Sequence, residues 1–186
     1  MAIRTAILTC ATLLVFGSAP SNQPGSQPTA ISPRSAPQFT SDGKLKLPRD
    51  YRAWAYVSTG FDMSYSQSSG HGESVFDNVF VQREAYDHFV RTRIWPDKTM
   101  FILELRQSSD HGSILRSGQF QGAIASIEAS VKDGSRFPEK WAYFDFGPTA
   151  TEAPAFPKEA RCFTCHKQNG AVDNTFVQFY PTLGIR

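Results

Sequence analysis

GAIASIEASVKDGSRFPEKWAYFDF, residues 122–146, predicts two neighbouring strands of a β-sheet. In its first part apolar and polar residues alternate, so that Ser126 and Glu128 share one face of a strand while Ile127 and Ala129 share the other. We therefore expect strands over residues 119–131 and 139–146. The link between them is too short for the crossover that parallel neighbours need, which favours an antiparallel pair.

The same period of two recurs upstream. Residues 51–58, 74–82 and 98–107 are rich in β-branched and aromatic residues and predict three further strands. Between the last two, residues 83–92 change to a helical period, with an apolar stripe that includes Phe89. About five strands, few helices and short links predict an α+β fold, a single domain around an antiparallel sheet.

Composition divides the chain into three parts. Residues 1–18 contain Arg4 followed by a short apolar run, which predicts a signal peptide or an uncleaved anchor; both deliver the domain to the exported, periplasmic side. Residues 19–43 are rich in Pro, Ser and Gln and predict a disordered linker, and residues 44–186 form the domain. The net charge of +2 and the lack of a basic run argue against a nucleic-acid partner.

The stretch ARCFTCHKQNG, residues 160–170, contains the candidate cofactor-binding residues. Cys162, Cys165 and His166 form C-x-x-C-H, the pattern for covalent attachment of a c-type haem, and the motif is expected to begin a helix. A redox disulfide with this spacing usually follows a strand of a βαβ unit, early in a domain. A zinc site needs a second pair of ligands, but the one remaining cysteine, Cys10, lies in the predicted leader. We therefore predict one haem c per chain, with His166 as iron ligand.

The second axial position is predicted to be open. Electron-carrying cytochromes commonly close it with methionine or histidine, but the 20 residues after His166 contain neither. Met63 lies in a polar loop, and Met100 shares a strand face with Ile102 and is expected in the core. Glu128 could accept a proton from an iron-bound ligand or lie on a solvated face, and the residues alone do not decide between these.

Four stretches are informative: LKLPRDYRAW (45–54), IEASVKDGSRFPEKWAYFDF (127–146), ARCFTCHK (160–167) and DNTFVQFYPTL (173–183). In their order and spacing they resemble the cytochrome P-460 family over residues 44–183. This resemblance implies an exported c-type haem protein that forms homodimers around an antiparallel sheet. Members of the family oxidise hydroxylamine and are linked to nitric oxide, and relatives called cytochrome c′-β chiefly bind diatomic gases.

The resemblance also assigns individual residues. The oxidising members carry a lysine that bonds to the haem macrocycle, and Leu103 stands at this position; Lys98, at the preceding turn, is not expected to replace it. A glutamate over the distal face of the haem is retained as Glu128. Family members typically carry an arginine on the second strand, and this chain has Asp77 at that position.

Two functions follow from these residues, and both stay open here. One is an oxidoreductase acting on hydroxylamine or nitric oxide, with His166 as the proximal ligand and Glu128 as the proton acceptor. The other is a gas-binding protein, in which Leu103 and Phe101 make an apolar distal wall. Plain electron transfer is less well supported because a second axial ligand is missing, and the redox partner is not identified.

Overall fold

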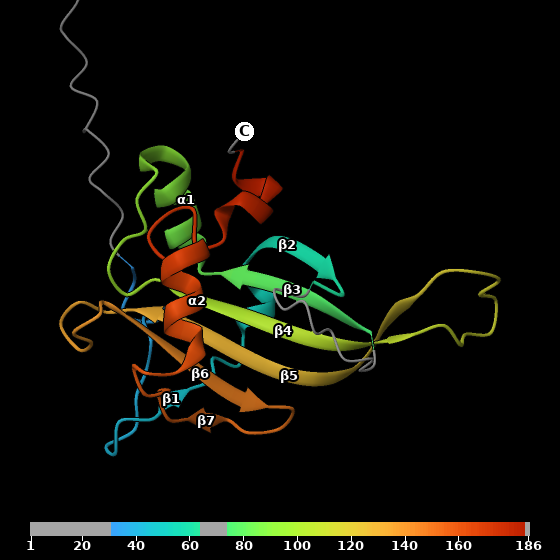
Figure 1. Cartoon of the computed structure of the whole chain (residues 1–186), viewed down its shortest axis with the longest axis horizontal. Coiled ribbons are helices and arrows are strands. Elements are labelled where there is room, and N and C mark those ends of the chain that lie inside the picture. Colours follow the sequence, from blue (N-terminus) through green and yellow to red (C-terminus); the bar gives the residue numbers. More distant parts are fainter. Residues whose placement is uncertain (1–30, 64–73, 185–186) are drawn as a thin grey trace, which may run out of the picture.

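A five-stranded antiparallel sheet forms the centre of the computed structural model, which describes residues 31–63 and 74–184 (Figure 1). The strand order follows the chain, and each strand pairs antiparallel with the next. This confirms the predicted α+β class and all five predicted strands. The strands are β2 (Ala55–Phe61), β3 (Val75–Val81), β4 (Met100–Ser109), β5 (Phe120–Lys132) and β6 (Trp141–Gly147).

Two helices accompany the sheet at the predicted places. Helix α1 (Arg83–Thr92) links β3 to β4, and α2 (Arg161–Asn169) begins one residue before the first cysteine of the C-x-x-C-H motif and contacts β6. The chain also forms elements that the sequence did not predict, because each is too short to show a period. They are the 3-10 helices η1 (Tyr51–Ala53), η2 (Val177–Phe179) and η3 (Pro181–Leu183), and the paired strands β1 (Leu45–Lys46) and β7 (Glu152–Ala153).

Apolar side chains on each face of the sheet form a separate core. Met100 and Ile102 lie in the core that β1, β7 and η1 cover, as expected for Met100. Phe101, one residue away along β4, lies in the core on the other face, below α1 and the C-terminal 3-10 helices. The alternation of a strand therefore decides which residues reach the α2 side, where the site lies.

Residues 31–43, which composition assigned to the linker, pack against the domain. The ring centroid of Phe39 lies 6.1 Å from that of Phe137 and 6.3 Å from that of Phe144. Ser35 donates a hydrogen bond from Oγ to Glu84 at 2.9 Å. One half-buried aromatic ring and a few polar contacts thus attach this segment to the domain.

The predicted signal peptide and the start of the predicted linker lie outside the described residues, as does most of the predicted loop 61–73. No helix in the described parts of the chain is long and apolar enough to cross a membrane.

A buried ionic cluster lies on the face of the sheet away from α2. The side chain of Glu104 is only 3% exposed and accepts a hydrogen bond from the Tyr51 hydroxyl. It also pairs with Arg52 Nη2 at 2.6 Å and with Arg106 Nε. Burial alone would raise the pKa of Glu104, but the bonds from Tyr51 and Arg106 and the two arginine charges bring it below its usual value.

Candidate functional site

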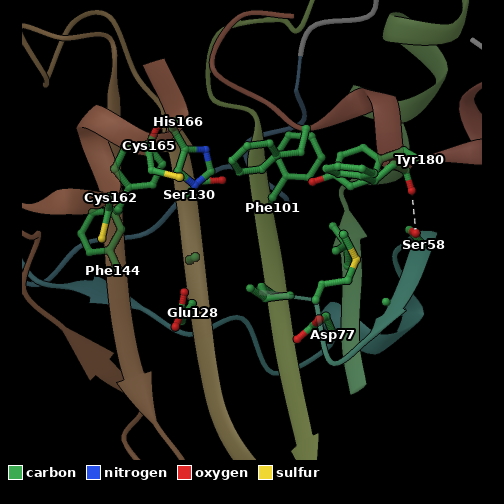
Figure 2. Close-up of a pocket in the computed structure, with 18 of the residues that line it drawn as sticks. Ser58, Asp77, Phe101, Glu128, Ser130, Phe144, Cys162, Cys165, His166 and Tyr180 are labelled. Atoms are coloured by element: carbon green, nitrogen blue, oxygen red, sulfur yellow. Dashed lines mark hydrogen bonds between the residues drawn. The ribbon is translucent and has the colours of Figure 1, made fainter. Parts of the chain in front are cut away.

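A cavity of about 480 Å³ lies between the sheet and α2, within the size range of about 300–1,000 Å³ that is typical of small-molecule sites (Figure 2). Strands β2 to β6 contribute one wall, and α2 and the C-terminal segment contribute the other. All six predicted site residues line this cavity: Phe101, Leu103, Glu128, Cys162, Cys165 and His166.

His166 is held in a defined orientation. Its Nδ1 lies 2.8 Å from the backbone carbonyl of Asn174 and must donate to it, which leaves Nε2 with a free lone pair. The ring contacts Tyr143 and Phe176, with centroid distances of 4.3 and 4.6 Å. Burial lowers the pKa of His166 against the opposing effect of the Asn174 hydrogen bond, so a neutral imidazole, the form that binds metals, is favoured.

The Asn174 carbonyl is presented by a turn that the sequence analysis missed. Asp173 and Asn174 adopt φ angles of 47° and 60°, in the left-handed region that Asp and Asn tolerate best. The Asp173 carboxylate accepts hydrogen bonds from Lys132 Nζ at 2.6 Å and from Trp141 Nε1 at 3.2 Å, which ties the turn to β5 and β6. The Asp-Asn pair is itself a turn signal that could have located it.

The two thiols share one side of α2 with the imidazole. Positions three and four apart on a helix are neighbours on its surface, so Cys162, Cys165 and His166 can all face the cavity. Both cysteines are free thiols and half-buried. Two thiols and a neutral imidazole on one helix, beside a largely apolar cavity, are the donor set that a covalently bound haem requires. The residues present therefore fit this group.

Glu128 lies across the cavity from His166 (Figure 2). It is opposite Leu103 in the β4–β5 register. Burial, and then the charges of Asp145 and Asp77, raise the pKa of Glu128 to about 7. A carboxyl group with such a pKa can both release and accept a proton near neutral pH. Because Glu128 is half-buried and lines the cavity, its place favours the role of proton acceptor over a solvated face.

Asp77 and Met63 also line the cavity, from the β2–β3 side. The Met63 side chain packs over Gly60, where a Cβ atom would come within 2.3 Å of its sulfur and 3.1 Å from Asp77 Oδ2. The pKa of Asp77 is raised, mainly by burial and against a hydrogen bond from the Met63 backbone. The sequence placed Met63 in a polar loop, whose composition gave no indication that it reaches the site.

Phe101 does not lie where the apolar distal wall was expected. Its ring packs against Trp95 and Tyr180 and lies on the same side of the cavity as His166 (Figure 2). Leu103 lies opposite Glu128 in the β4–β5 register. The reason is the geometry of β4, because two residues along a strand span about 6.5 Å. Phe101 and Leu103 therefore share a face of the sheet but line different parts of the cavity.

Comparison with known proteins agrees with this donor set. The family model for cytochrome P460 matches residues 48–177, well over half of the chain, from the segment before η1 to the first residue of η2. No curated protein matches the chain. Cytochrome P460 proteins bind haem, as the motif and the cavity lead one to expect. On this match, the chain belongs to the cytochrome P460 family.

Proposed function

We propose that this protein is an exported mono-haem c-type cytochrome whose open distal side binds a small nitrogen species such as nitric oxide. One observation carries the proposal: two thiols and a neutral imidazole on one side of α2 line a cavity opposite Glu128 and Leu103. Residues 1–18 support export, and the resemblance to the family supports a homodimer.

In this proposal α2 holds the cofactor. Cys162 and Cys165 would hold the haem through thioether bonds, and His166 would bind its iron through Nε2. The Asn174 carbonyl keeps the ring oriented by accepting the Nδ1 hydrogen bond. A bound haem would supply an iron that can bind a small ligand. On the opposite wall, the carboxyl group of Glu128 would accept or release a proton near neutral pH.

The distal side is proposed to be open because neither methionine near the site is well placed to close it. Met100 is 1% exposed and packs in the core on the opposite face of the sheet. Met63 packs over Gly60 of β2, the edge strand, which is separated from β5 and Glu128 by β3 and β4. Leu103, Glu128 and Asp77 occupy the wall itself.

Leu103 favours ligand binding over hydroxylamine oxidation. The resemblance places a haem-bonding lysine at this position in the oxidising members, and a leucine has no nucleophilic atom with which to form such a bond. A second candidate function, oxidation of hydroxylamine, is supported by Glu128, whose pKa of about 7 suits proton transfer.

The test is the absorption spectrum of the reduced, haem-loaded protein at neutral pH, before and after addition of nitric oxide. We expect a high-spin, five-coordinate spectrum that changes completely when nitric oxide binds. Met63→Leu, and Met100→Leu as a matched control in the core, should leave the initial spectrum unchanged. A low-spin spectrum that becomes high-spin in Met63→Leu alone would show a closed site and would favour electron transfer instead.

A further inference from the structure

Two carboxyl groups stand on the same wall of the cavity, on either side of Leu103. Leu103 pairs with Glu128 of β5 and with Val79 of β3. Asp77 lies two residues before Val79 and therefore on the same face of the sheet. Both carboxyl groups line the cavity and lie across it from His166 (Figure 2).

Both groups are partly withdrawn from water, and the charge of Asp77 acts on Glu128. Burial raises the pKa of each, and the charges of Asp145 and then Asp77 raise the pKa of Glu128 further. Of the described residues that line the cavity, Arg161 alone carries a permanent positive charge, and it is exposed at the start of α2. The wall across from His166 thus presents negative charge that no nearby cation in the lining offsets.

We propose that Asp77, together with Glu128, selects ligands by charge, so that the cavity admits neutral or positively charged small molecules and rejects anions. Nitric oxide and hydroxylamine belong to the first class, whereas azide and nitrite belong to the second. The physical reason is that like charges repel strongly in a partly desolvated cavity, where water screens them poorly. The inference rests on the proposed function, because it assumes that ligands reach an iron held by His166.

The test compares azide and nitric oxide binding to the haem-loaded protein by absorption titration. It is run at pH 8, above the pKa of about 7 at which Glu128 ionises. The ratio of azide affinity to nitric oxide affinity is expected to rise about tenfold in Asp77→Asn, and further in Asp77→Asn combined with Glu128→Gln. Asp77→Glu, which keeps the charge, should retain the low ratio.

A matched control distinguishes the effect of charge in the cavity from the effect of the net charge of the protein. Glu139 is exposed in the turn between β5 and β6, and Glu139→Gln should leave the ratio unchanged. An equal ratio in the wild type and the double variant, with nitric oxide binding intact, would overturn the selection by charge and leave the proposed function standing. Failure of the wild type to bind nitric oxide would overturn both.

Discussion

Replacement of both Cys162 and Cys165 with alanine is expected to abolish covalent haem attachment completely. These are the two free thiols of the described chain, and both line the cavity beside His166. The thioether bonds need both sulfur atoms, and alanine offers no atom that can replace them. The measurement is haem staining after denaturing electrophoresis of protein that is co-expressed with a c-type maturation system.

Thr164→Ala is the matched control for this experiment. Thr164 lies between the two cysteines on α2 and is exposed, so its loss changes the same turn of helix without touching the cavity. This variant should stain like the wild type. Undiminished haem staining in the double cysteine variant would show that the haem is attached elsewhere.

The largest loss of stability is expected when Arg52 and Arg106 are both replaced with methionine. Methionine keeps much of the aliphatic volume of arginine but leaves Glu104 buried with no cationic partner. Removing the partners of a buried charge typically costs about 3–5 kcal/mol in free energy of unfolding. Denaturant unfolding at pH 7 measures this loss. Arg83→Met removes an exposed arginine, paired with Asp87 at 4.0 Å, and should cost under about 1 kcal/mol.

The loss should depend on pH, and a third substitution should reverse it. The pKa of Glu104 is lowered in the folded wild type, so its contribution to stability is present above the unfolded value of 4.5 and disappears as the pH falls. The deficit of the double variant should therefore shrink in acid. Adding Glu104→Gln removes the buried charge and should restore most of the stability at pH 7. A triple variant no more stable than the double would contradict this explanation.

The alternation of polar and apolar residues was enough to predict the sheet. It located all five strands, and it placed Glu128 on the face opposite Ile127, as the structure has them. Periodicity could not locate β1 and β7, because each contains two residues and its position depends on a partner distant in the sequence. The composition of residues 31–43 could not show that Phe39 attaches them to the domain, because a single aromatic residue hardly changes the average of a polar segment.

The residues of the candidate site could be predicted only where they lie close together in one short segment of the sequence. Cys162, Cys165 and His166 follow one another within a single helix, so their spacing alone indicates their common direction. The carbonyl of Asn174 is a backbone group, and its approach to His166 depends on a turn bonded to two strands. The joint position of Asp77 and Glu128 depends on the register of three strands, which the sequence does not contain.

The decisive measurement is mass spectrometry of the haem peptides that proteolysis releases from the wild-type protein. We expect one haem-bearing peptide that contains both Cys162 and Cys165, with no bond between the haem and any other residue. Leu103, which lines the cavity opposite Glu128 in the β4–β5 register, has no atom that could form such a bond. Cysteine peptides free of haem, or a third bond between the protein and the haem, would contradict the proposed attachment.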